Sequence, residues 1–321
     1  GNAVIIKPSE MASASTVLFA ELLADVVPNG LINVVTGYGD EVGAAIVDAD
    51  AVKKVSFTGS EVGGAKVAAT AAKHVKPSTL ELGGKSPQIV FADADLESTI
   101  NGVMSGIFLS NGQSCVAGSR LIIHDDIREA FVERLKEKLR GLHFGSPMLE
   151  GTDIGPIANK AQFDKILSMV DRAKQEGATV TSGGVSKNVP GFEGGYFIEP
   201  TILENVSLSA EIWRQEVFGP VLCVRSFSST EEAVSLANDS DYGLAAGIWT
   251  TNEKLATDVA SKINSGTIYI NHYRSVNAHA PVGGIKKSGY GRELGPNAIL
   301  DFMQEKVIWN GKVDMPDPFP R

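Results

Sequence analysis

Short apolar runs rich in β-branched residues alternate with longer amphipathic stretches along most of the chain, and this alternation constrains the fold more than any other feature. In the first part, the strand-like and helix-like segments are Ala3–Lys7, Ala12–Val27, Leu31–Val35, Glu41–Val47, Lys54–Phe57 and Ser60–Lys73. Strands that alternate with helices in this way predict a parallel sheet wrapped by helices.

A second series of strands and helices follows the first. Its strand-like and helix-like segments are Gln88–Phe91, Leu96–Leu109, Ser119–His124, Arg128–Arg140, Ala158–Gln175, Pro220–Phe227 and Gly266–Asn271. The segment Gly183–Pro200 is rich in glycine and proline, which is typical of a loop with a hairpin. Two glycines that follow a strand, Gly83 and Gly84, indicate a flexible joint between two domains.

Charge and composition exclude several classes of protein. The net charge of −9 argues against a nucleic acid or an anionic membrane surface as the main partner. We expect no transmembrane helix and no signal peptide, and the presence of only two cysteines favours the cytoplasm. The chain starts at Gly1 without a methionine and enters a strand-like run at once, so we expect it to be part of a longer protein.

The turn Phe57-Thr58-Gly59-Ser60 stands where a strand ends and a helix begins, with Gly64 one turn inside the helix. Free backbone N–H groups at a helix start, with little side-chain bulk around them, can bind a phosphate. The alternative is a tight turn in which Ser60 only caps the helix. The dinucleotide fingerprint Gly-x-Gly-x-x-Gly is absent from this turn.

Lys7, Ser9 and Glu10 follow the first strand, and open parallel sheets bind ligands at strand ends of this kind. A lysine there can donate to ribose or phosphate oxygens, and a glutamate can accept from a ribose diol. The alternative is a solvated loop followed by a helix cap made of serine and glutamate.

Glu81 lies in an apolar strand, within Leu80–Lys85, beside two glycines. Burial raises the pKa of a carboxyl group and brings it toward the range of a general base. The alternative is a structural role for Glu81 as the salt-bridge partner of Lys85 or of another lysine.

Cys115 follows a long helix and precedes a strand, among the small and polar residues of Asn111–Arg120. Such neighbours leave a thiol accessible, and a nucleophilic thiolate needs both access and a lowered pKa. The alternative is a buried cysteine that acts as a small hydrophobic residue. Cys223 fits that alternative, because it lies in the apolar run Val221–Val224.

Taken together, these segments resemble the aldehyde dehydrogenase family. Leu80–Lys85 matches the family's LELGGK motif, which carries a glutamate, and Gly112–Cys115 matches its GQxC motif, which carries a cysteine. Further matches to the family's motifs are Lys7–Glu10, Phe57–Ser60, Glu216–Pro220 and the C-terminal signature Pro281–Gly295. The matches follow the family's order and extend over Gly1–Gly295.

This resemblance implies an α/β protein with two Rossmann-type parallel-sheet domains and a C-terminal oligomerisation strand. Residues 1–83 would be the C-terminal part of the NAD-binding domain, residues 84–284 the catalytic thiol domain, and residues 285–321 a return segment with an oligomerisation tail. The cofactor-binding residues would be Lys7, Ser9, Glu10, Gly37, Thr58, Gly59, Ser60, Gly64, Leu82, Gly83, Glu216 and Phe218. The negative charge of Glu10 would repel the extra phosphate of NADP, so we expect NAD.

The resemblance also implies an oxidation. The thiolate of Cys115 would attack an aldehyde, a hydride would pass to the nicotinamide, and Glu81 would activate the water that hydrolyses the thioester. One alternative is a CoA-acylating semialdehyde dehydrogenase, which does without this glutamate. Another is a catalytically incompetent fragment or structural homologue. In the family an asparagine upstream of the first strand of this chain binds the oxyanion, so the backbone N–H of Cys115 would be only half of an oxyanion hole.

The loop His272–His279 corresponds to a border of the family's aldehyde tunnel. Arg274 could bind a substrate carboxylate there, and the alternative is a solvated or structural arginine. The tail Asp301–Asn310 ends in an apolar, strand-like run, and such a tail implies a homodimer or homotetramer. No His, Cys, Asp or Glu cluster has the spacing of a metal site, so we expect no metal.

Overall fold

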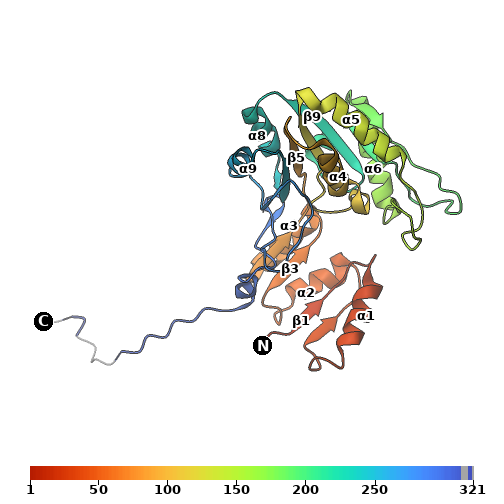
Figure 1. Ribbon diagram of the computed structural model, residues 1–321. Helices are drawn as coiled ribbons and strands as arrows, with labels where there is room; N and C mark the ends of the chain where they lie inside the picture. Colours follow the sequence, from red (N-terminus) through yellow and green to blue (C-terminus); the bar gives the residue numbers. More distant parts are fainter. Residues whose placement is uncertain (312–316, 320–321) are drawn as a thin grey trace.

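The computed structural model describes residues 1–311 and 317–319 and consists of a smaller N-terminal lobe and a larger lobe (Figure 1). The elements of the N-terminal lobe are β1 (Val4–Ile6), α1 (Ser13–Leu23), β2 (Ile32–Val34), η1 (Gly39–Gly43), α2 (Ala44–Asp48), β3 (Val55–Thr58), α3 (Glu61–Lys73) and β4 (Ser78–Glu81).

The larger lobe contains the next series of elements. They are β5 (Pro87–Val90), α4 (Leu96–Ile107), η2 (Leu109–Gly112), β6 (Arg120–His124), α5 (Asp125–Arg140), α6 (Lys160–Gln175), β7 (Thr179–Ser182), β8 (Thr201–Glu204), α7 (Glu211–Arg214), β9 (Val221–Phe227), α8 (Thr230–Asn238), β10 (Tyr242–Gly243), β11 (Ala245–Trp249), α9 (Glu253–Ala260) and β12 (Thr267–Ile270). The chain then returns toward the N-terminal lobe through β13 (Ile285–Lys286), β14 (Gly289–Tyr290) and η3 (Ala298–Phe302).

A seven-stranded sheet with the order β12-β11-β5-β6-β9-β8-β7 forms the centre of the larger lobe. All neighbouring pairs are parallel except β7 and β8, which are antiparallel. Successive side chains of β6 alternate between two hydrophobic cores: Ile122 belongs to one, and Leu121 and Ile123 belong to the other. Helices α4 and α5 cover one face, while α6, α8 and α9 cover the opposite face.

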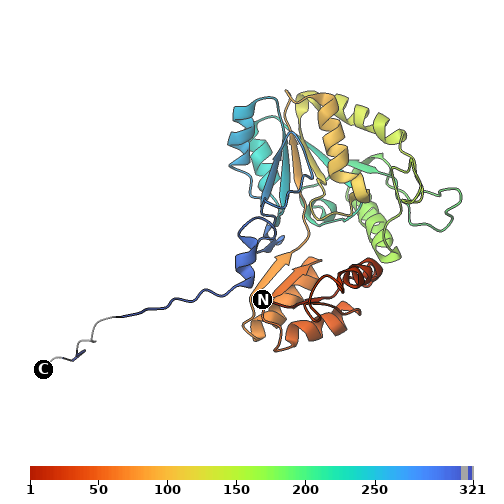
Figure 2. The ribbon, with the colours of Figure 1, turned by 60° about the horizontal axis from the view of Figure 1, so that its bottom comes forward.

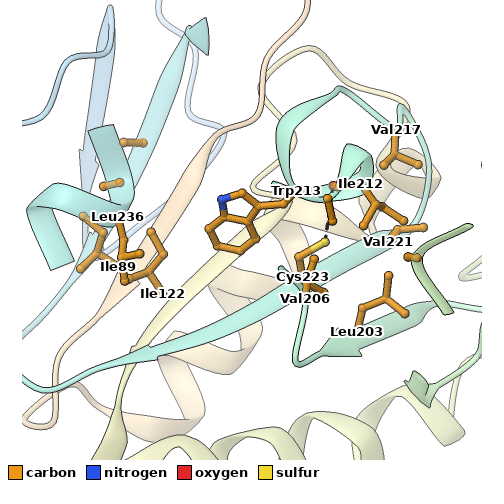
Figure 3. Packing of buried hydrophobic residues seen from close by; sticks show 14 of the residues in the cluster. Ile89, Ile122, Leu203, Val206, Ile212, Trp213, Val217, Val221, Cys223 and Leu236 are labelled. Carbon is orange, nitrogen blue, oxygen red and sulfur yellow. Dashed lines mark hydrogen bonds between the residues drawn. The ribbon is translucent and has the colours of Figure 1, made fainter. Parts of the chain in front are cut away.

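Cys223 lies in the first of these cores. Its side chain is fully buried, packs near Trp213 and Val221, and has its sulfur 3.6 Å from the carbonyl oxygen of Ile212 (Figure 3). The sequence-based interpretation of Cys223 as a small hydrophobic residue is therefore confirmed.

The strands of the N-terminal lobe form two small sheets. β1 pairs in parallel with β2, while β3 pairs in parallel with β4, whose other edge takes β14 in antiparallel orientation. The parallel pairing predicted for this part is present within each sheet, but the strands divide between two sheets instead of forming one. β14, from the far end of the chain, adds an antiparallel edge that no local pattern reveals. α1 has no buried residue, and Phe19 and Leu22 on it are exposed.

Several predicted element ends also shift. α1 ends at Leu23 rather than near Val27, and α5 begins at Asp125 rather than at Arg128. The expected helix Glu41–Val47 divides into η1 and α2. η3 ends at Phe302, and the residues from Met303 to Gly311 are exposed and form no regular structure in the single chain.

The two lobes are joined through the segment Leu82–Ser86, called here the lobe connection (Figure 2). All of its residues are buried. Within the described residues, no helix is long and apolar enough to span a membrane.

Candidate active site

Cys115 lies in a turn formed by Ser114–Ala117, in which the N–H of Ala117 donates to the carbonyl of Ser114 over 3.0 Å. The side chain of Cys115 is half-buried. The turn follows η2, where Ser110, Asn111 and Gly112 all have positive φ angles, which reverses the chain direction after α4.

Gly112 shows why this segment needs a glycine. A Cβ atom at this position would lie only 2.1 Å from the carbonyl oxygen of Gly219. The segment before Cys115 and the segment Glu216–Pro220 are far apart in sequence, and they approach each other at their backbones here.

Glu81 is the last residue of β4, with β3 on one side and β14 on the other. It is only 8% exposed, and its Oε1 has no hydrogen-bond partner among the described residues. Burial and, after it, the nearby charge of Glu293 raise the pKa of Glu81 to about 7, against the lowering effect of Arg292. This carboxyl group therefore titrates near neutral pH, as a general base should.

The alternative salt bridge between Glu81 and Lys85 is not formed. Lys85 is 1% exposed, and its Nζ has no hydrogen-bond partner in the described part of the chain. Burial lowers the pKa of this amine. Glu81 and Lys85 are thus two separately buried groups.

We predict that Glu81→Gln changes stability in a pH-dependent way. The pKa of Glu81 is raised in the folded chain, so stability falls as pH rises from about 4.5 through about 7. The glutamine variant escapes this loss, which amounts to about 3 kcal/mol at pH 8. Urea denaturation at pH 5 and pH 8 measures it.

The matched control for this prediction is Glu129→Gln, on the exposed surface of α5. This variant should show the same difference from the original chain at both pH values. If the free energy of unfolding of Glu81→Gln relative to the original chain were equal at pH 5 and pH 8, the buried, high-pKa state of Glu81 would be wrong.

The lobe connection holds the Cys115 turn and Glu216 against the end of β4. A Cβ atom at Gly84 would lie 2.6 Å from the carbonyl oxygen of Cys115, and one at Gly83 would lie 2.4 Å from Oε2 of Glu216. The N–H of Gly84 donates to Oε1 of Glu216 over 3.0 Å. The two glycines, expected to make the joint flexible, thus permit close packing between the lobes.

Burial raises the pKa of the Cys115 thiol, and the charges of Glu216 and Glu81 act in the same direction. The backbone N–H groups of Val116 and Cys115 oppose these effects and lower the pKa of the thiol. The lowered pKa that a thiolate nucleophile requires is therefore not supplied by these residues alone. The charge of Glu81 thus acts on the Cys115 thiol.

Glu216 and Phe218 belong to a loop held by the larger lobe. Burial raises the pKa of the half-buried Glu216 carboxyl group. The backbone of Phe218 has a φ of 56°, and Gln162 Nε2 donates to the carbonyls of Val217 and Phe218 over 2.8 and 3.0 Å. These contacts hold the loop against α6.

The expected cofactor residues of β1 and β2 meet at the carboxyl ends of these parallel strands. Nζ of Lys7 donates to the carbonyl of Gly37 over 3.0 Å. Ser9 and Glu10 are exposed in the turn before α1. The structure therefore brings Lys7 and Gly37 together, and places Ser9 and Glu10 at the same edge of the sheet.

The turn Thr58–Ser60 leads into α3. Ser60 caps this helix, since its Oγ accepts from the N–H of Gly63 over 3.1 Å, and Thr58 and Gly59 are exposed. Gly64 is buried, and a Cβ atom there would lie 2.6 Å from Leu82. Gly64 thus allows α3 to pack closely on the lobe connection, while Thr58–Ser60 remain open at the helix start.

A bridge between the lobes that the sequence did not reveal is centred on Tyr242. Its hydroxyl lies 3.1 Å from Oε2 of Glu61, in the first turn of α3, and 3.1 Å from Oε1 of Gln215, next to Glu216. Lys287 also contacts Glu61, at 3.4 Å. Tyr242 therefore connects the start of α3 to the Glu216 loop.

Arg120 is a second residue that the sequence did not single out. It is 1% exposed, and its guanidinium donates to the carbonyls of Lys85, Leu236 and Ala237 over 2.8 to 2.9 Å. The Arg120 side chain therefore links the lobe connection to the end of α8. Arg120 is also the first residue of β6, the strand that follows the Cys115 turn.

No group of three or more His, Cys, Asp or Glu side chains that could hold a metal ion occurs in the parts of the chain that the structure describes. His272 and His279 are exposed in the loop after β12.

A sequence profile of the aldehyde dehydrogenase family matches residues 1–308 of this chain. Betaine aldehyde dehydrogenase of Brucella anthropi is 47% identical over 319 residues, which are 98% of this chain and 65% of that protein. The chain thus spans 65% of the length of this curated relative.

Solved structures match as well. The NAD+ complex of an aldehyde dehydrogenase from Bacillus cereus is 43% identical, with a TM-score of 0.94, over 97% of this chain and 63% of that one. An NAD-dependent aldehyde dehydrogenase from Sinorhizobium meliloti is 40% identical, with a TM-score of 0.94, over 98% and 62% of the two chains. These matches confirm the predicted fold class.

Proposed function

The chain belongs to the aldehyde dehydrogenase family, and we propose that the full-length protein oxidises an aldehyde to a carboxylic acid with NAD+ as hydride acceptor. The observation that carries this proposal is the packing of the Cys115 turn against the lobe connection, next to a buried Glu81 whose pKa is about 7. A sulfur nucleophile and a carboxyl base thus share one site.

In the proposed reaction, the Cys115 sulfur attacks the carbonyl carbon and forms a thiohemiacetal. NAD+ supplies the acceptor for the hydride that this carbon loses, and its positively charged ring favours the thiolate. Glu81 then takes a proton from the water that hydrolyses the thioester on Cys115. A base with a pKa near 7 supports this hydrolytic route over transfer of the acyl group to CoA.

The residues present fit the cofactor. The Gly84 N–H orients the Glu216 carboxylate over the glycines of the lobe connection, and a carboxylate so held can accept from a ribose diol. Lys7 and Gly37 share one sheet edge, where open parallel sheets bind nucleotides. NAD+ also occurs in the complex of the Bacillus cereus relative. The carboxylate of Glu10 supports NAD over NADP.

A panel of aldehydes, given to the full-length protein with NAD+ in the presence and absence of CoA, tests the proposal. We expect NADH without CoA. If turnover depended on CoA, the acylating alternative would be correct, and if no aldehyde gave NADH, the proposed oxidation would be wrong.

Tyr242→Phe is predicted to weaken NAD+ binding about tenfold or more, because it removes the hydroxyl between Glu61 and the Glu216 loop. Calorimetric titration of the full-length protein with NAD+ measures this directly. Tyr196→Phe, on a tyrosine that packs against Phe163 of α6, serves as the control. An unchanged dissociation constant for Tyr242→Phe would exclude the bridge from cofactor binding.

We further propose a homodimer or homotetramer in the cytoplasm. The tail supports assembly, because Val307, Ile308 and Trp309 are 75%, 81% and 92% exposed. Both cysteines are free, which suits a reducing compartment.

A further inference from the structure

The loop after β12 holds the Cys115 segment from both sides. The Tyr273 hydroxyl donates to the carbonyl of Val116, directly after Cys115, over 2.9 Å. Nη1 of the next residue, Arg274, donates to the carbonyl of Leu109, at the start of η2, over 2.8 Å. Two successive residues therefore contact the chain before and after the thiol, so the Arg274 guanidinium lies beside the Cys115 segment.

Two tyrosine rings lie near both this guanidinium and the thiol. The rings of Tyr269 and Tyr273 have centroids 4.9 Å apart, and Tyr273 is buried. The charges of Arg274 and Cys115 both act on each of these two hydroxyl groups. The guanidinium, the rings and the thiol therefore share one neighbourhood.

The positive charge of Arg274 is not balanced by a carboxylate in the described residues. Its hydrogen bonds go to the carbonyls of Leu109 and Ser105 and to the Ser110 hydroxyl. The backbone of Arg274 has a φ of 62°, so its side chain leaves the loop from a left-handed turn. A cation held on η2 thus lies near the chain that leads to Cys115.

Aromatic rings alone would attract a cationic substrate. A guanidinium next to the same rings repels it, and in a partly buried site the repulsion between two charges extends over several ångströms. We propose that Arg274 makes the aldehyde site selective against aldehydes that carry a quaternary ammonium group. This inference rests on the proposed aldehyde oxidation, and it separates this chain from its relatives named for betaine aldehyde.

The test compares betaine aldehyde with 3,3-dimethylbutanal, which has a carbon atom in place of the charged nitrogen and nearly the same shape. In the full-length protein we expect kcat/KM for the neutral aldehyde to exceed that for betaine aldehyde by on the order of tenfold or more. Arg274→Met should remove most of this ratio, chiefly through the KM for betaine aldehyde. Arg274→Lys keeps the charge and should keep the ratio.

The quantity compared between variants is the ratio of kcat/KM for the neutral aldehyde to kcat/KM for betaine aldehyde. Damage to the chain around Cys115 lowers both values and therefore leaves their ratio unchanged. The inference would be wrong if betaine aldehyde were oxidised as efficiently as its neutral analogue. It would also be wrong if Arg274→Met left the ratio unchanged. A failure of the proposed oxidation looks different, since NADH would then be absent with every aldehyde.

Discussion

Cys115→Ala in the full-length protein is expected to lower aldehyde-dependent NADH formation by about 10⁴-fold or more, because it removes the atom that bonds to the substrate. Cofactor affinity should persist, since Cys115 touches the lobe connection through its backbone carbonyl, which alanine retains. Steady-state rates with NAD+ and an aldehyde, together with calorimetric titration of NAD+, measure both effects.

Cys223→Ala is the matched control, because Cys223 is the other cysteine of the chain and is fully buried in the core. This variant should retain most of the activity and lose some stability, as large-to-small core substitutions do. Near-normal turnover by Cys115→Ala would remove the thiol from the mechanism.

Glu81→Gln is expected to produce a burst of NADH equal to the amount of enzyme, followed by a steady rate about 10²- to 10⁴-fold slower than that of the original protein. The amide has the shape of the carboxyl group but cannot take the proton of the attacking water. Hydride transfer precedes that step, so the first turnover remains while the thioester accumulates. Rapid-mixing measurements of NADH absorbance separate the two phases.

The pH dependence provides a second check on Glu81. The carboxylate is the active form, so the hydrolytic rate of the original protein should rise as pH increases through about 7 and then level off. Glu81→Gln should lose this rise. A steady rate that the substitution leaves unchanged would assign water activation to another group.

The residues of the candidate site could be predicted because each stands in a local motif. Glu81 beside two glycines, Cys115 among small residues and Glu216 before Phe218 are all visible in the sequence. The alternation of strands and helices likewise predicted four strands of the seven-stranded sheet of the larger lobe, β5, β6, β9 and β12, with bounds within one residue of those observed. It did not predict β7, β8 and β11.

What the sequence could not reveal depends on contacts between distant segments. β14 completes a sheet with β4, and Tyr242 reaches Glu61 across the lobes, yet neither leaves a periodic pattern. Glycine roles were misjudged for the same reason: Gly83 and Gly84 suggest freedom when seen alone, and only the neighbouring Glu216 and Cys115 show that they serve close packing.

The raised pKa of Cys115 was also hidden from sequence reasoning. Small polar neighbours suggested an accessible thiol, and a thiolate nucleophile needs a lowered pKa as well. In the fold the thiol is half-buried, and burial together with the charges of Glu216 and Glu81 raises its pKa. The proposed reaction resolves this disagreement through the positive charge of the bound cofactor, which these residues alone do not provide.

The most direct measurement is mass spectrometry of the Glu81→Gln full-length protein after it is mixed with NAD+ and butanal and quenched in acid. We expect a butanoyl group on the peptide that contains Cys115, in an amount equal to the NADH burst. An acyl group on Cys223 or on another residue, or an NADH burst without any acylated peptide, would contradict the thiol mechanism.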